Sequence, residues 1–183
     1  MRRDELEAYA GRTIPDLLPD DLRLLFVGIN PGLVSAATGL HFARRGNRFY
    51  PALERAGVLP SGIVTAEAAA PALLERGVGI TNVVARASAR ADELTDDEVV
   101  AGYRRLDAFV AERRPRVVAM LGITSYRVAT GDRRARAGKQ SRDWHGAEVW
   151  VAPNPSGLNA HATLDSLAAD YREIALAAGV VRA

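Results

Sequence analysis

Two loops rich in asparagine, proline and glycine contain the residues best suited to catalysis. The first is Gly-Ile-Asn-Pro-Gly at residues 28–32, and the second is Asn-Pro-Ser-Gly-Leu at residues 154–158. Asn-Pro-Gly alone is a common turn, but two such loops at the ends of buried strands can bring amides and backbone donors to one cleft. The first loop lacks the Gly-Lys-Ser/Thr ending of a Walker loop and the G-x-G-x-x-G spacing of a dinucleotide site. The sequence therefore predicts a cleft for a polar ligand with few charges.

The residue types that the chain lacks exclude several other kinds of catalysis. None of its 183 residues is cysteine, which rules out disulfides, thiolate metal sites, iron–sulfur clusters and cysteine nucleophiles. Only three histidines are present, and we do not expect a zinc site built from them. We therefore expect no metal ion, and a cleft formed from amides and backbone donors.

The charge of the chain does not identify a partner by itself. It has 23 arginines and one lysine against 22 acidic residues, a formal net charge of +2. Arginine forks suit phosphate oxygens, but a general bias toward arginine explains the same count. One segment either contacts phosphate or is simply a soluble loop, and its basic residues are Arg133, Arg134, Arg136, Lys139 and Arg142.

The elements that must position the two loops follow from apolar patterning. Apolar runs predict buried strands at residues 22–28, 116–121 and 148–152, with a shorter extended segment at 78–84. Between them, amphipathic segments predict helices at residues 47–56, 66–76, 95–115, 125–130 and 165–178. Alternation of strands and helices predicts an α/β sandwich with a mostly parallel sheet. Ligands of such sheets bind beyond the carboxyl ends of the strands, where both loops lie.

Length and hydropathy set the organisation of the chain. We expect a single domain over residues 1–183, with residues 1–20 forming an N-terminal arm or helix and 131–146 a loop or hairpin. No apolar run approaches the roughly 20 residues of a membrane span, and the N-terminus lacks the apolar stretch of a signal peptide. A cytoplasmic monomer without a membrane partner is the expectation.

The motifs and their order resemble those of the mismatch-specific uracil/thymine-DNA glycosylases, from about Thr13 to Ala178. The matching segments are GINPG at 28–32, GLHFARRGNRFY at 39–50, GITNVVAR at 79–86 and NPSGL at 154–158. The resemblance implies a three-layer α/β/α fold with a central, mostly parallel sheet, and no metal or organic cofactor. It also implies a DNA repair enzyme that flips uracil, thymine or a cytosine adduct out of a mismatch with guanine in double-stranded DNA. The enzyme then hydrolyses the N-glycosidic bond and leaves an abasic site.

The resemblance assigns catalysis to Asn30, which would hold the attacking water. An aspartate, the stronger acceptor, occupies this position in uracil-specific relatives, so slow chemistry is expected. Asn154 stands where those relatives have a histidine that supports the leaving base. Phe42 would stack on the flipped base, or else belong to the core. Asn82 would read the pyrimidine edge, or else cap a strand end.

Further residues are assigned to the pocket wall by the same resemblance. Gly32 stands where uracil-specific relatives have a bulky tyrosine, so an open pocket is expected. Ser35 would line that pocket, and Ile29 would contribute its backbone amide.

The second loop is expected to contact DNA through Ser156, Gly157 and Leu158, with the leucine entering the gap left by the flipped base. Some relatives have an arginine just beyond this leucine that contacts the unpaired guanine. Here the following residues are Asn159, Ala160 and His161. His161 either replaces that arginine or is an ordinary surface histidine.

Two other functions are compatible with these residues. The first is a mismatch- or lesion-binding protein with little turnover, because an asparagine replaces the catalytic aspartate. The second is a small α/β nucleotide-binding protein, against which the missing phosphate loop counts. Base release from a duplex distinguishes the enzyme from both.

Overall fold

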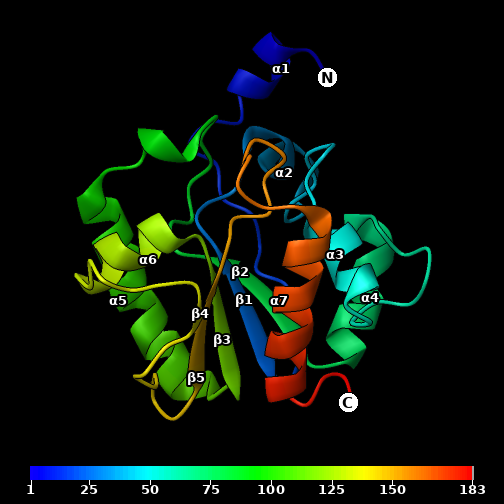
Figure 1. Cartoon of the computed structure of the whole chain (residues 1–183). Helices are drawn as coiled ribbons and strands as arrows, with labels where there is room; N and C mark the ends of the chain where they lie inside the picture. The colour runs from blue at the N-terminus through cyan, green and yellow to red at the C-terminus, as the bar shows by residue number, and fades with distance from the viewer. Residues whose placement is uncertain (183) are drawn as a thin grey trace.

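The structure is a computed structural model that describes residues 1–182. A five-stranded sheet forms its centre (Figure 1). The strand order is β2-β1-β3-β5-β4. Strands β1 (Leu24–Gly28), β2 (Val78–Asn82), β3 (Val117–Leu121) and β5 (Glu148–Ala152) are parallel, and the short β4 (Gly138–Lys139) pairs antiparallel to β5. The predicted, mostly parallel sheet is therefore confirmed, and residues 131–146 contain β4, the first strand of an edge hairpin whose second strand is β5.

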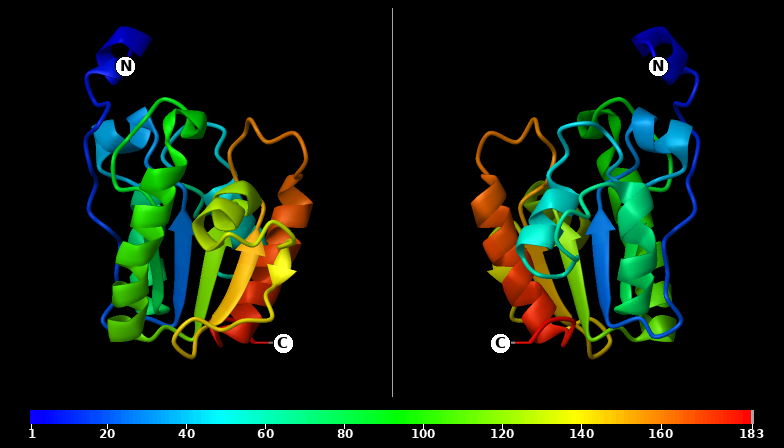
Figure 2. Two further views of the ribbon diagram at one scale, coloured as in Figure 1. Left: turned by 90° about the vertical axis from the view of Figure 1, so that its left-hand side faces the viewer. Right: turned by 90° about the vertical axis from the view of Figure 1, so that its right-hand side faces the viewer.

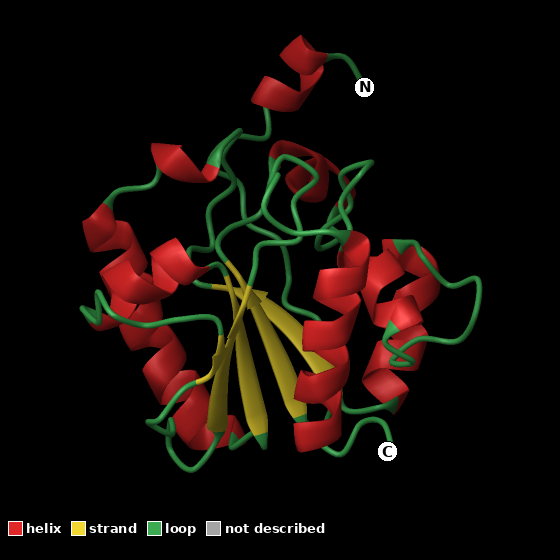
Figure 3. Cartoon of the chain, viewed as in Figure 1, coloured by secondary structure: helices red, strands yellow, loops and turns green. Residues whose placement is uncertain are grey.

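Helices cover both faces of the sheet, which makes three layers (Figures 1 and 3). Helices α3 (Phe49–Arg55), α4 (Ala66–Glu75) and α7 (Leu164–Ala177) lie on one face. Helices α5 (Asp96–Arg113) and α6 (Ile123–Thr130) lie on the other. The predicted α/β fold is confirmed, and helix boundaries differ from those expected by a few residues.

The central strands are continuous apolar runs because both of their faces are covered. In β1, Leu24 and Phe26 belong to the core beneath α3 and α7, whereas Leu25 and Val27 belong to the core beneath α5. All four side chains are buried. This alternation fixes the register of β1 and places its carboxyl end, and the loop that follows, at a defined point of the sheet edge.

Short helices and loops gather at the carboxyl ends of the strands (Figure 2). Helix α2 (Leu33–Thr38), the 3₁₀ turn η1 (Ala91–Glu93) and the N-terminal helix α1 (Arg3–Glu7) lie at this end. The sequence patterns did not predict α2, which is a six-residue helix ended by Gly39 at a positive φ of 74°. The rest of the N-terminal arm runs down the sheet edge, where Leu17 pairs with Ile80 of β2.

No helix within residues 1–182 is both long enough and apolar enough to cross a bilayer.

Candidate active site

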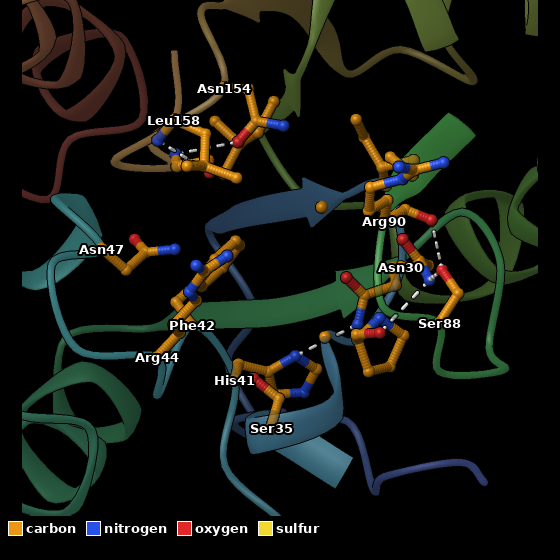
Figure 4. A pocket seen from close by; sticks show the side chains of 18 of the residues that line it. Asn30, Ser35, His41, Phe42, Arg44, Asn47, Ser88, Arg90, Asn154 and Leu158 are labelled. Carbon is orange, nitrogen blue, oxygen red and sulfur yellow. Dashed lines mark hydrogen bonds between the residues drawn. The ribbon is translucent and has the colours of Figure 1, made fainter. Parts of the chain in front are cut away.

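A cavity of about 370 Å³ opens at the carboxyl ends of β1, β2, β3 and β5 (Figure 4). Among the described residues that line it, none is an aspartate or a glutamate. Nowhere in residues 1–182 are three or more His, Asp or Glu side chains placed to hold a metal ion. The cavity, called the base cavity below, includes nine of the expected site residues: Ile29, Asn30, Gly32, Ser35, Phe42, Asn82, Asn154, Ser156 and Leu158.

The amide of Asn30 is held in one orientation at this cavity. Its Nδ2 lies 2.8 Å from Ser88 Oγ and 3.2 Å from the backbone oxygens of Pro31 and Arg86. Because carbonyl oxygens only accept hydrogen bonds, the group facing them is the NH₂. The Oδ1 atom remains without a donor among the described residues and is free to accept a hydrogen bond from a bound water.

Ser88 is a further residue of the candidate site, and no sequence motif marks it. Its hydroxyl donates to the backbone oxygen of Arg90 at 2.6 Å and therefore accepts from Asn30. The two residues are 58 positions apart, and they meet because the pairing of β1 and β2 continues past the strand ends. Val84 N–H donates to Ile29 O at 2.9 Å and Ser88 N–H to Pro31 O at 3.2 Å. The sequence could have indicated Ser88 only indirectly, because segments that follow two neighbouring parallel strands lie side by side.

Asn82 is oriented in a similar way by His41, a residue for which the sequence motifs predict no role. The Nε2 of His41 lies 3.0 Å from Pro15 O and therefore carries the imidazole proton. The unprotonated Nδ1 accepts a hydrogen bond from Asn82 Nδ2 at 3.2 Å. Asn82 is almost completely buried, and its orientation follows from the tautomer of His41.

Burial lowers the pKa of His41 below its ordinary value of 6.5, although Pro15 and Asp16 partly oppose the shift. Between the lowered folded-state pKa and 6.5 the unfolded chain binds a proton that the folded chain does not. The free energy of unfolding should therefore fall as pH drops through about 6.5. We expect His41→Gln to flatten this dependence, measured by urea unfolding at pH 7.5 and pH 5.5. An unchanged pH dependence in the variant would show that His41 is not the responsible group.

Phe42 has one ring face in the core and lines the base cavity. It stacks on Phe49 with ring centroids 4.2 Å apart, and its backbone has a positive φ of 53°, which is rare for a bulky residue. Gly28 allows this arrangement, because a Cβ on Gly28 would lie 2.4 Å from Asn82 Oδ1 and 3.1 Å from the Phe42 ring. Phe42 thus packs against the core and also lines the cavity.

The remaining wall of the base cavity is open near Gly32. A Cβ on Gly32 would meet no atom within 4 Å, so this side offers room to a ligand. Ser35 is buried and its hydroxyl accepts from Ala43 N–H at 3.3 Å. The backbone oxygen of Ile29 accepts from Val84, which anchors that residue to the chain after β2.

The second predicted loop, residues 154–158, continues to residue 162, and residues 154–162 are called the second loop below. Asn154 Oδ1 accepts from Ser156 N–H at 2.9 Å, which leaves its Nδ2 as a donor for a ligand. Leu158 is 72% exposed at the cavity mouth and lies next to Asn154 in Figure 4. His161 is exposed and does not line the base cavity, and Gly157 lies in an adjoining groove.

Arg48 anchors the second loop to the rest of the protein. Its guanidinium donates to the backbone oxygens of Ser156 at 2.6 Å, Asn159 at 2.9 Å and Ala162, and its backbone N–H donates to Pro155 O at 3.0 Å. Five N–H donors in a rigid fork make arginine suited to such a role. The shape of this loop is thus set by a residue over 100 positions earlier.

Arg44 and Arg45 are the unpaired basic residues at the mouth. They line a groove of about 280 Å³ with Asn47, Gly157 and Leu158, and neither side chain has an ion pair or hydrogen bond within residues 1–182. None of the basic residues of segment 133–142 lines the base cavity or this groove. In that segment, Lys139 pairs with Glu148 at 2.8 Å.

Comparison with known proteins identifies a family and a similar fold. The sequence profile of the uracil DNA glycosylase superfamily matches residues 15–176. A solution NMR structure of a candidate uracil DNA glycosylase from Methanosarcina acetivorans superposes with a TM-score of 0.60. It is 18% identical, and the match covers 90% of this chain and 98% of that one.

Proposed function

Because the chain belongs to the uracil DNA glycosylase superfamily, we propose that it flips a mispaired uracil out of double-stranded DNA and hydrolyses its N-glycosidic bond. Proteins of this superfamily bind DNA. The observation that carries the proposal is the amide of Asn30, a residue that lines the base cavity: its NH₂ is held by protein acceptors, and its oxygen has no donor among the described residues.

The reaction needs the base to leave the stack before the glycosidic bond can be reached. Extrusion costs a few kcal/mol, and less for a mispaired base, so a mismatch is favoured before any contact is made. Bond breakage then gives an oxocarbenium-like sugar and a base anion. Asn30 Oδ1 would hold the water that attacks C1′, and the free Nδ2 of Asn154 would donate to the leaving base.

Recognition of the base would come from Phe42 and Asn82. The cavity-facing side of the Phe42 ring offers a stacking surface, and the amide of Asn82 can accept from one pyrimidine atom and donate to the next. The open space at Gly32 leaves room for a 5-methyl group or a bulkier adduct. We therefore expect thymine and cytosine adducts to enter the cavity as well as uracil.

The absence of a carboxylate among the described cavity residues favours one alternative, a lesion-binding protein with little turnover. Single-turnover base release separates the two functions. The substrates are duplexes of otherwise identical sequence with uracil, thymine, hypoxanthine or an etheno adduct opposite guanine. The glycosylase is supported by free base from the uracil duplex, and the binding protein by tight retention without release.

The exposed side chain of Leu158 is proposed to fill the gap left by the flipped base. Leu158→Ala should slow excision from duplex DNA by about tenfold, since unstacking a step costs a few kcal/mol. Excision from single-stranded DNA should change little, because no stack must be held open. Stability should fall by less than about 0.5 kcal/mol, as for other exposed positions. A large loss of thermal stability with equal loss on both substrates would mean that Leu158 is structural.

Arg44 and Arg45 are proposed to contact DNA phosphates. The slope of log affinity against log salt is negative, and Arg44→Ala/Arg45→Ala should make it less steep by about 0.9 for each phosphate that is no longer neutralised. Arg133→Ala/Arg134→Ala is the matched control, with the same charge change away from the cavity. Equal slopes for the two double variants would contradict the assignment.

A further inference from the structure

A two-point ion pair joins the loop after β2 to helix α5. Arg86 Nε lies 2.5 Å from Glu98 Oε1, and Arg86 Nη2 lies 2.9 Å from Glu98 Oε2. The same Nη2 donates to Glu93 O at 3.2 Å. Glu98 also belongs to the capping box of α5, where it accepts from Thr95 N–H at 2.9 Å. Glu98 thus joins the two ends of the segment between residues 86 and 95, which is called the closed segment below.

The closed segment carries two of the three acceptors that hold the Asn30 amide. Arg86 O accepts from Asn30 Nδ2 at 3.2 Å, and Ser88 Oγ accepts from it at 2.8 Å. The side chain of Arg86 therefore faces α5 while its backbone faces Asn30. A shift of this segment would move both acceptors together.

Helix α5 holds the ion pair in a fixed position relative to the sheet, because the helix contacts the end of β2 at two further points. A Cβ on Gly102 would lie 2.0 Å from Val83 O, so the helix and the chain after β2 are in direct backbone contact. Arg105 donates to Asn82 O at 2.8 Å. An acceptor tied to this helix has a fixed position relative to the base cavity.

We propose that the Arg86–Glu98 ion pair positions the amide of Asn30 for catalysis, an inference that rests on the proposed function. Both are positioning residues, and they act through the backbone of Arg86 and the hydroxyl of Ser88. The hydrogen bond from Arg86 lowers the pKa of Glu98 to about 2, so the carboxylate stays charged in any ordinary assay. The effect of removing the charge should accordingly not depend on pH above about 5.

The test is Glu98→Gln, which keeps the size of the side chain and an oxygen for the capping box but removes the charge. Single-turnover excision should fall about tenfold, since small displacements of a catalytic group cost up to about 100-fold. In an Asn30→Ala background the same change should have no further effect, because the amide that it positions is gone. A substrate with 5-fluorouracil, a better leaving group, keeps the residual rate measurable. DNA affinity should be unchanged.

Glu148→Gln is the matched control, because it breaks the Lys139–Glu148 ion pair away from the base cavity. An equal loss from Glu98→Gln with and without Asn30, or no loss at all, would overturn the proposal. If Glu98→Gln does not fold, Arg86→Lys keeps the charge, loses the two-point contact and is measured in the same way.

Hydrogen exchange gives a readout that does not depend on activity. The Ser88 amide, which donates to Pro31 O, should exchange faster in Glu98→Gln than in the parent chain and Glu148→Gln. If the parent chain releases no base from any duplex, the proposed function fails, and this exchange rate alone decides whether the ion pair holds the segment. Unchanged exchange would overturn the ion pair's role.

Discussion

Asn30→Ala should abolish most base excision, lowering the single-turnover rate about 100- to 1,000-fold. The substitution removes an oxygen at the base cavity whose orientation is fixed by three protein acceptors of the same amide. Duplex binding should be retained, because Leu158, Arg44 and Arg45 are untouched. Excision is measured with enzyme in excess over a duplex that contains uracil opposite guanine, and binding is measured with the same duplex.

The control for this result is stability. Asn30 makes hydrogen bonds at a partly buried site, so its loss should lower the free energy of unfolding by only about 1–3 kcal/mol. An Asn30→Ala protein that is folded, binds DNA and excises uracil as fast as the parent would remove Asn30 from the mechanism.

An aspartate at position 30 would be a stronger acceptor for the water, as in uracil-specific relatives. We nevertheless do not expect it to speed up excision in this chain. The NH₂ of Asn30 faces the backbone oxygens of Pro31 and Arg86, so an aspartate would place a charged oxygen against two carbonyls. The Ser88 hydroxyl, which now donates to Arg90 O, would have to turn to compensate. We therefore expect Asn30→Asp to be no faster than the parent chain at neutral pH.

Gly28→Ala should have the second largest effect, about a 100-fold loss of excision. The new methyl group would lie 2.4 Å from Asn82 Oδ1 and 3.1 Å from the Phe42 ring. Asn82 is held by His41, so the methyl group can enter only if the Asn82 amide or the Phe42 ring, both of which we propose to contact the base, moves. Overpacking of this kind also lowers stability, by about 1–3 kcal/mol.

A matched glycine separates pocket closure from a general effect of the substitution. Gly32→Ala adds the same methyl group at the other end of the loop, where no atom lies within 4 Å. Excision of uracil should be nearly unchanged in Gly32→Ala. If Gly28→Ala excises uracil as well as Gly32→Ala does, the space above Gly28 does not hold the base.

Much of the fold was predictable because its central strands are buried on both faces. Strands β1 and β3 are short apolar runs that follow an arginine and end at a glycine, and α5 begins at the capping box of Thr95 and Glu98. Helix α2 escaped prediction because six residues carry too little periodicity. Local pattern thus located the long elements and missed the short one beside the cavity.

The residues of the candidate site were predictable only where motifs marked them. Asn30 and Asn154 lie in recognisable loops, whereas Ser88, His41 and Arg48 act through partners far along the chain. Their roles depend on backbone oxygens, such as Pro15 O for His41, which have no sequence signature. Tertiary contacts, rather than residue types, therefore decided which polar side chains complete the site.

The most direct test of the proposed activity is product analysis after the parent chain reacts with a duplex that has one uracil opposite guanine. We predict free uracil together with an intact strand that has an abasic site where the uracil was, and far less of both products from Asn30→Ala. A duplex that is bound tightly by the parent chain but still contains its uracil after prolonged incubation would contradict the proposed activity.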